Sequence, residues 1–376
     1  MTSRERLLAA LAHRAPDRVP MDLGGTMAST LTLPAYERLR AYLGLPPDPA
    51  PALFARRSQT VIPAEDLLEG FPADVRPLML GAPALRPERW LGPDAFLDEW
   101  GVTWRRPGTG HYLPAQGPFQ TLEAPGAEDL GRFPWPDPED PGRYEGLAER
   151  ARRLRQAGHY AIALSLGVGP VHLAQFMRGY AEFLEDLLER PAFAEGLLDG
   201  ITEFWVRVLS RALAEAGEWV DLVVLYDDLG TQRGPLLRPE LYQRLIRPRH
   251  ARLAAPVKQA GKPLLWHSCG SIRKLIPDLL EIGVDAVNPV QVSAAGMDTR
   301  ELKREFGSRL AFWGGVDTGR ILPFGTPQEV RREVRRRLED LSEGGGYVLC
   351  AVHNLQADVP PENIAAMYEA ALEWGR

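Results

Sequence analysis

Eight short apolar runs recur along the chain, separated by polar loops and, in the second half, by segments with helical periodicity. The runs occupy residues 18–23, 75–80, 160–166, 221–226, 263–267, 284–289, 310–315 and 346–352. Helical spacing of apolar residues follows in the segments 239–261, 271–283, 326–344 and 360–375. Apolar strands that alternate with helices are typical of a parallel sheet covered by helices, and eight units favour a closed barrel over an open sheet. The 376 residues therefore predict one α/β domain, 1–376, with the (β/α)8 TIM-barrel architecture.

Two segments lie outside this repeat. The first residues, MTSRERLLAALAHR, carry Thr2 and Glu5 at capping-box spacing and predict an N-terminal helical extension. Residues 82–135 place aromatic residues and Thr between Gly and Pro, as in EWGVTWRR and HYLPAQGPF. We expect a small antiparallel insertion there, a flap or lid, before the chain returns through a helix near 139–157.

Charge and cysteine content narrow the class of protein. The formal net charge of −6 argues against a nucleic-acid partner, because such proteins usually need a basic face. The N-terminal residues contain no apolar stretch long enough for a signal peptide or a membrane span. Two cysteines do not make a disulfide framework. We therefore expect a cytoplasmic protein with reduced thiols and no membrane association.

Polar and titratable residues gather after the predicted strands, where a barrel of this kind places its active site. The candidates for substrate binding are His172, Asp227, Gln232, Asn288, Gly315 and Asn354, and those for catalysis include Asp228 and Asp317. The Asp227-Asp228 pair fits a general base, a substrate clamp or a helix N-cap equally well. His172 lies near a helix start, which also suits a structural role.

The stretch LLWHSCGS places His267 and Cys269 two residues apart at the end of a predicted strand. Residues i and i+2 of a strand point to the same side, so both side chains can reach one point at the barrel mouth. An imidazole and a thiolate are good zinc ligands, and three protein ligands are typical of a catalytic zinc site. The last strand offers Cys350 or His353 as the third ligand. The alternative is that Cys269 and His267 are buried packing residues without a metal.

Taken together, these motifs resemble the uroporphyrinogen decarboxylase superfamily, and more closely its branch of methylcobalamin:coenzyme M methyltransferases. The resemblance is strongest in GVGPVHLAQFMRGYAEFLEDL, YDDLGTQRGPLLRPELYQRLIRPRH, WHSCGSIRKLIPDLLEIGVDAVNPVQ, FWGGVDTGRILPFGTPQEV and GGGYVLCAVHNLQADVPPENI. It implies a single (β/α)8 barrel. True decarboxylases of the family carry an arginine-rich N-terminal segment for the substrate propionates, whereas RVPMDLGGT lacks an arginine cluster after the strand.

The methyltransferase branch implies a zinc ion bound by the H-x-C motif, here His267 and Cys269, and by a ligand after the last strand. Alignment on PENI (361–364) puts that ligand on His353, with Cys350 as the substitute, and Glu65 resembles a carboxylate that fills the open zinc position. The resemblance further implies methyl transfer between a corrinoid such as methylcobalamin, carried by a partner protein, and a small thiol, pterin, methoxy or methylamine substrate. It leaves the protein a monomer or a homodimer.

Two other functions stay open. One is a metal-free decarboxylase acting on a smaller acid, with Asp66 in the place of the family's catalytic aspartate. The other is a binding barrel without activity. Metal content separates both from the methyltransferase.

Overall fold

The computed structural model describes residues 1–108 and 110–376, and its centre is a parallel seven-stranded sheet in the order β14-β13-β12-β11-β10-β9-β4. The strands are β4 (Val75–Met79), β9 (Ala161–Val168), β10 (Leu222–Tyr226), β11 (Leu264–His267), β12 (Ala286–Asn288), β13 (Ala311–Trp313) and β14 (Tyr347–Val348). All neighbouring pairs are parallel. Seven of the predicted strands are thereby confirmed.

The predicted first strand, 18–23, is reduced to one bridging residue that closes the barrel. Met21 forms parallel bridges to Leu349, next to β14, and to Ala73, next to β4. Pro20 has no N–H to donate, and Gly24 turns the chain at φ 81°, so the ladder stays short on both sides. The edges of the sheet are therefore joined across Met21, in agreement with a TIM barrel.

The barrel interior is filled by alternate strand residues. They form one buried cluster that includes Val75, Ala161, Ala163, Leu222, Val224, Leu265, Ala286, Ala311, Trp313 and Val348. Four of these are alanines, which leaves room for the indole of Trp313. Leu7 and Leu11 of α1 (Ser3–Leu11) join the same cluster, and α1 begins with the predicted capping box.

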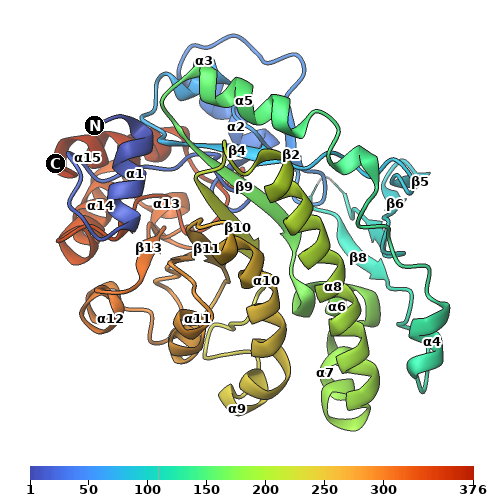
Figure 1. The fold of residues 1–376 in the computed structure, drawn as a ribbon. Helices are drawn as coiled ribbons and strands as arrows, with labels where there is room; N and C mark the ends of the chain where they lie inside the picture. Colours follow the sequence, from blue (N-terminus) through green and yellow to red (C-terminus); the bar gives the residue numbers. More distant parts are fainter. Residues whose placement is uncertain (109) are drawn as a thin grey trace.

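The helix α1 covers the amino-terminal end of the barrel. Its backbone contacts the residues just before two strands, through Arg4 N to His159 O at 2.7 Å and Gly346 N to Ala10 O at 2.8 Å. The two chain ends lie near each other at this side of the molecule (Figure 1). The carboxyl ends of the strands, where the candidate residues lie, are left for the active site.

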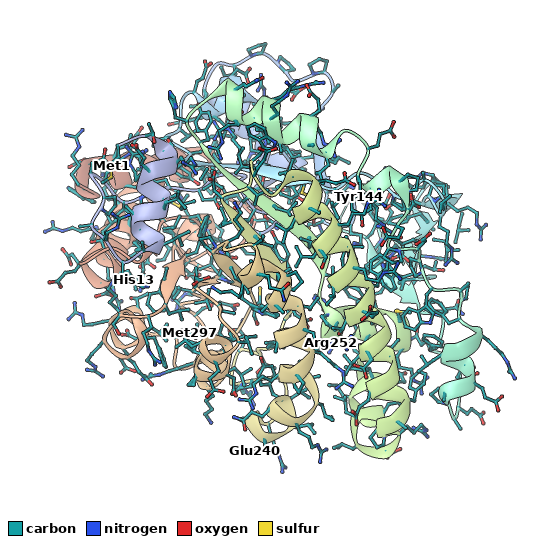
Figure 2. The ribbon with its side chains drawn as sticks, in the orientation of Figure 1. Met1, His13, Tyr144, Glu240, Arg252 and Met297 are labelled. Carbon is teal, nitrogen blue, oxygen red and sulfur yellow. The ribbon has the colours of Figure 1, made fainter. Side chains whose placement is uncertain are left out.

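Helices surround the sheet, and their side chains fill the space around the strands (Figure 2). The helices are α2 (Leu33–Tyr42), α3 (Glu65–Leu68), α4 (Ala127–Arg132), α5 (Leu147–Ala157), α6 (Pro170–Arg178), α7 (Tyr180–Glu189), α8 (Pro191–Ala216), α9 (Pro239–Leu241), α10 (Arg247–Gln259), α11 (Ile276–Glu281), α12 (Thr299–Phe306), α13 (Ile321–Phe324), α14 (Pro327–Leu341) and α15 (Pro361–Trp374). Short 3₁₀ turns lie at Pro141–Arg143 and Arg273–Leu275. Among residues 1–108 and 110–376, no helix has the length and apolarity needed to cross a membrane.

The segment predicted as one helix over 239–261 is divided into α9, a π-helical turn at Tyr242–Ile246 and α10. Pro248 has no N–H for the ordinary bond to Arg244, and the N–H of Arg247 reaches back five residues to Tyr242. The proline thus explains the wider turn, which the periodicity alone did not predict.

The predicted insertion is an antiparallel four-stranded sheet, β5 (Arg89–Gly92), β6 (Ala95–Leu97), β7 (Thr103–Arg105) and β8 (Leu113–Gln116). It lies on the side of the barrel away from α1 (Figure 1). Trp104 of β7 packs edge-on against Phe176 of α6, with ring centroids 4.9 Å apart. A second antiparallel sheet, β1 (Leu31–Thr32), β3 (Thr60–Val61) and β2 (Leu53–Ala55), was not predicted.

Candidate metal centre

Three potential metal ligands meet at the carboxyl end of the barrel. His267 is the last residue of β11, Cys269 lies two residues later, and His353 follows β14. One ligand atom of each residue lies within 4.8 Å of the others, and His267 Nε2 is 3.6 Å from Cys269 Sγ. The structure thus brings the predicted pair together with His353.

Strand alternation directs His267 into the barrel. Leu265 belongs to the interior cluster, whereas Leu264 and Trp266 pack in the cluster between strands and helices. His267, two residues after Leu265, therefore points inward. Gly270 then turns the chain at φ 88°, packed so closely against Gly230 that a Cβ would lie 2.5 Å from its carbonyl carbon. A side chain at Gly270 would push Cys269 away from the barrel mouth.

A buried amide fixes the ring of His267. Its Nδ1 lies 2.6 Å from Oδ1 of Asn288 in the neighbouring strand β12, and Asn288 Nδ2 donates to the carbonyl of Trp313 at 3.3 Å. The second bond orients the amide, so that its oxygen faces the imidazole. Nδ1 therefore carries the proton, and Nε2 keeps its lone pair toward Cys269.

The carboxylate of Asp228 lies beside this cluster. It accepts a hydrogen bond from the backbone N–H of Cys269 at 2.9 Å, and its two oxygens lie 3.7 Å from His267 Nε2 and 3.6 Å from His172 Nδ1. Burial raises the pKa of Asp228, but the two histidines and the backbone N–H outweigh it, so that the pKa ends below its ordinary value. Asp228 is therefore an anion at neutral pH.

The remaining two ligands differ in protonation. Burial and then the charge of Asp228 raise the pKa of the Cys269 thiol, so it stays protonated at neutral pH unless a cation binds. Burial and then the charge of His267 lower the pKa of His353 to about 4, so its imidazole is neutral at pH 7. The imidazoles of His267 and His353 and the thiol of Cys269 form a donor set for a soft divalent metal.

These residues fit zinc. Bonds of about 2.0–2.3 Å in a tetrahedral arrangement put the ligand atoms roughly 3.5 Å apart. The 3.6 Å between His267 Nε2 and Cys269 Sγ matches that spacing. His353 completes three protein ligands, the number found in catalytic zinc sites that reserve a position for a substrate.

The cluster lies between two hollows. The first, which we call the aromatic chamber, has a volume of about 290 Å³, and its lining includes Trp104, Tyr112, Phe176, Tyr180, His267 and His353. The second, the polar hollow, is lined among others by Thr231, Gln232, Cys269, Gln291, Asp317 and His353. His353 faces both, whereas His267 lines only the chamber and Cys269 only the hollow.

Three predicted site residues lie elsewhere. Cys350 is buried in the barrel interior with Trp313, and its thiol donates to the carbonyl of Ala351 at 3.2 Å, so it is not part of the ligand cluster. Glu65 forms an ion pair with Arg76 of β4. Arg76 follows Val75, which points into the barrel, so Arg76 and its partner Glu65 lie on the outer side of the sheet.

Asp66 is likewise removed from the barrel mouth. Its carboxylate forms a two-point pair with Arg40 of α2 at 2.7 Å. It lines neither the aromatic chamber nor the polar hollow. The structure thus contradicts the placement of Glu65 at the metal and of Asp66 at the catalytic position.

Asp227 serves mainly as a cap. Its carboxylate accepts the backbone N–H groups of Val171 and His172, in the first turn of α6, at 3.0 and 2.8 Å, and lies 2.8 Å from His250 Nε2. Of the alternatives that the sequence left open for Asp227, the helix N-cap is therefore the one observed. The helix that Asp227 caps, α6, is far from it in the chain. Through this contact Asp227 holds His172 at the chamber wall.

The other predicted site residues, including the catalytic candidate Asp317, are divided between the hollows. His172 and Asn354 line the aromatic chamber, and Gln232 and Asp317 line the polar hollow. Gly315 lines neither hollow, and a Cβ at this position would face Arg337 of α14. Its φ of 103°, which side-chain-bearing residues rarely adopt, explains why the residue is a glycine.

The sequence interpretation missed the wall that the insertion builds. Arg57, Trp104, His111 and Tyr112 line the aromatic chamber together with Phe176 and Tyr180. The aromatic residues in EWGVTWRR and HYLPAQGPF did indicate that this segment packs on another surface, because a short antiparallel segment cannot bury several aromatic rings by itself. The sequence did not say that this surface was the barrel mouth.

A family model described as uroporphyrinogen decarboxylase (URO-D) matches residues 109–374. The chain belongs to the uroporphyrinogen decarboxylase family. Its relatives include the uroporphyrinogen decarboxylase of Alkalilimnicola ehrlichii, 24% identical over 97% of this chain and 93% of the relative. They also include the methylated-thiol–coenzyme M methyltransferase of Methanosarcina mazei, 25% identical over 78% of this chain and 73% of the relative.

Among solved structures, a methyltransferase from Methanosarcina mazei matches over 99% of both chains with a TM-score of 0.67 and 19% identity. This likeness supports the barrel architecture. The family and its methyltransferase-like branch, which the motifs indicated, are thereby confirmed. The relatives' activities differ from one another, so activity has to be argued from the site.

Proposed function

We propose that this family member is a zinc-dependent methyltransferase that moves a methyl group between a corrinoid on a partner protein and a small-molecule substrate. The observation that carries the proposal is the cluster of His267, Cys269 and His353, which lies between the aromatic chamber and the polar hollow. The similarity to a methylated-thiol–coenzyme M methyltransferase supports the same reaction class.

When bound, zinc would act as a Lewis acid toward a thiol or toward the heteroatom that carries a methyl group. His267, Cys269 and His353 would hold the ion, and Asn288 would keep His267 Nε2 directed at it. Asp228 orders the backbone of Cys269 and faces Nδ1 of His172. His172 lines the chamber and would be the acceptor for a substrate proton.

The transfer exchanges one bond for another. With a thiol substrate, the S–H proton leaves, the sulfur lone pair forms the new C–S bond, and the cobalt–carbon pair stays on the corrinoid as cobalt(I). With a methylated substrate the same exchange proceeds in reverse, and the departing heteroatom takes a proton.

Decarboxylation is the competing function, because several relatives are uroporphyrinogen decarboxylases. A tetrapyrrole with many carboxylates needs a wide cleft and several cations. The aromatic chamber is about 290 Å³, and Arg57 is the one arginine or lysine among its described lining residues. The described lining of the chamber therefore offers fewer cations than a substrate with many carboxylates needs.

The test is a spectral assay of zinc-loaded protein with methylcobalamin and a panel of small thiols, and in reverse with cobalt(I) corrinoid and methyl ethers or methyl thioethers. We expect corrinoid demethylation or methylation with at least one compound, and loss of at least about 100-fold of that rate in Cys269→Ala. Carbon dioxide release from a carboxylated substrate by zinc-free protein would refute the proposal in favour of decarboxylation.

A further inference from the structure

A buried chain of hydrogen bonds lies behind the wall of the aromatic chamber and ends at His172. The phenol oxygen of Tyr242 is 3.2 Å from His250 Nδ1, and His250 Nε2 is 2.8 Å from Asp227 Oδ2. The carboxylate of Asp227 in turn accepts the backbone N–H groups of Val171 and His172. Tyr242 and His250 are not among the described lining residues of the chamber or the polar hollow, so any effect they have on the site passes through Asp227 and other neighbours.

The direction of these hydrogen bonds follows from the groups at each end. A carboxylate accepts hydrogen bonds, so the Nε2–H of His250 donates to Asp227, and Nδ1 of the same ring keeps its lone pair. Burial, and then the charges of Asp278 and Asp227, raise the pKa of Tyr242, so its O–H is present to donate to Nδ1. Tyr242, His250 and Asp227 are each at most 1% exposed. Removal of one member therefore leaves a buried polar atom of the next without its partner.

The π-helical turn before α10 brings Tyr242 and His250 onto one face. The two residues are eight positions apart, which in a regular α-helix puts them about 80° apart around the axis, at about 100° per residue. The turn at Tyr242–Ile246, closed by the N–H of Arg247 on the carbonyl of Tyr242, takes up one additional residue. The offset then becomes that of seven residues, about 20°, and the phenol reaches the imidazole.

Asp227 links the strand ends that carry the site. It follows β10, and its backbone N–H donates to the carbonyl of His267, the last residue of β11, at 3.0 Å. Its carboxylate holds the first turn of α6, which follows β9 and contains His172. The ring of His250 also packs on Trp266 of β11, with centroids 4.4 Å apart. A shift of Asp227 would therefore move His172 relative to the metal ligands.

We propose that Tyr242 and His250 are positioning residues for the reaction: they hold the Asp227 carboxylate in the orientation that keeps the first turn of α6, and with it the His172 imidazole, at the chamber wall. The inference rests on the proposed function only for the role of His172 as the proton acceptor. Without the N–H of His250, the buried carboxylate has to rotate toward another donor, and the N–H groups that start α6 lose a fixed acceptor. A displacement of about 1 Å in a reacting site can cost about 100-fold in rate.

The first readout needs no substrate: the imidazole nitrogen NMR signals of His172 in metal-free protein at pH 8, assigned with His172→Gln. Asp228 faces Nδ1 of His172, so we expect one tautomer and two well-separated nitrogen signals in the parent. In His250→Phe, which keeps a ring but removes the donor, the two signals should move toward each other. Tyr242→Phe should have a smaller effect, because His250 still donates to Asp227. His250→Gln, which can still offer an N–H to Asp227, should resemble the parent.

The second readout is the rate of methyl transfer by zinc-loaded protein. His250→Phe should lower kcat at least about tenfold and leave KM within about threefold of the parent's value. Val257→Ala is the matched control, because Val257 is buried in the same helix α10 but is not among the described lining residues of either hollow. It should lower the stability to unfolding through lost packing and keep the His172 signals and kcat of the parent.

Each outcome decides the proposal. His172 signals that move in His250→Phe and stay in Val257→Ala, together with the fall in kcat, support it. Unchanged His172 signals in folded His250→Phe, equal movement in Val257→Ala, or an unchanged kcat overturns it. If His250→Phe does not fold, Tyr242→Phe decides by the same two readouts. A parent that transfers no methyl group refutes the proposed function, whereas the NMR result still decides whether Tyr242 and His250 position His172.

Discussion

The hydrogen bond between Asn288 and His267 gives the sharpest prediction about the metal centre. Asn288→Ala removes the acceptor 2.6 Å from His267 Nδ1, in a position where both residues are almost fully buried. The imidazole then loses the contact that fixes its tautomer and its rotation, while all three ligands remain present. The change therefore tests whether His267 is a ligand through Nε2, without removing a ligand atom.

The expected magnitude follows from the role of such outer contacts. Loss of the partner of a metal-binding histidine typically weakens metal affinity by about 10–100-fold, or roughly 1.4–2.7 kcal/mol. Because His267 and Asn288 are both almost fully buried, we expect a value in the upper half of this range. Competition of the protein with a chromophoric chelator for zinc at pH 7 measures it.

Asn363→Ala is the matched control. Asn363 is also a buried asparagine, but its amide donates to the carbonyls of Leu322 and Gly325, away from the cluster. Both variants should lower the free energy of unfolding of the metal-free protein, by about 1–3 kcal/mol, because Asn288→Ala leaves the Nδ1–H of buried His267 without an acceptor and Asn363→Ala removes the donor to two backbone carbonyls. Only Asn288→Ala should weaken zinc binding. Equal zinc affinity in Asn288→Ala and the parent, with both folded, would refute the assigned role of His267.

Three further changes test the surroundings of the site. Cys350→Ala should leave the zinc content unchanged and cost about 1–2 kcal/mol of unfolding free energy, since Cys350 is packed in the barrel interior; zinc loss would show that it is a ligand. In metal-free protein, the pKa of His353 is about 4 in the folded state and about 6.5 in the unfolded state. His353 therefore has no effect on stability above pH 6.5. As the pH falls from 6.5 to 4, the unfolded state takes up a proton that the folded state does not, and the free energy of unfolding falls by up to about 3 kcal/mol. His353→Asn should flatten that part of the pH dependence measured by urea unfolding, and an unchanged profile would contradict it. Asp227→Ala should cost about 3 kcal/mol or more, because two N–H groups of α6 and buried His250 lose their partner; a change under about 1 kcal/mol in thermal or urea unfolding would contradict this.

Much of the fold was predictable because its signal is local. Each strand that the apolar runs predicted after the first is present, since a buried parallel strand needs a continuous apolar run whatever its neighbours are. The first run failed as a strand for an equally local reason, the proline at 20 and the turn at Gly24. The π-helical turn before α10 depends on Pro248, which periodicity alone does not weigh.

The candidate site was predictable only where two residues share one strand end. His267 and Cys269 follow from the two-residue period of β11. The choice between His353 and Cys350 depended on which way the chain turns after β14. The positions of the Glu65 and Asp66 side chains depended on their ion pairs with Arg76 and Arg40, which belong to other segments of the chain. Such pairings are tertiary contacts, and no local pattern carries them.

The chamber was the least predictable part. Its wall combines the turn that carries Arg57, the insertion sheet and α6, three segments with no pattern in common. The sequence showed that residues 82–135 form an antiparallel insertion, but neither its aromatic residues nor Arg57 indicated the surface they would cover.

The most direct test of the metal centre is the zinc content of the full chain purified without chelator, measured beside Cys269→Ala, His353→Ala and Cys350→Ala. We expect about one zinc per chain in the parent and in Cys350→Ala, and loss of zinc in the Cys269 and His353 variants, all four folded. A folded parent without zinc that also takes up none on addition, or full zinc in Cys269→Ala, would contradict the metal centre and with it the proposed methyl transfer.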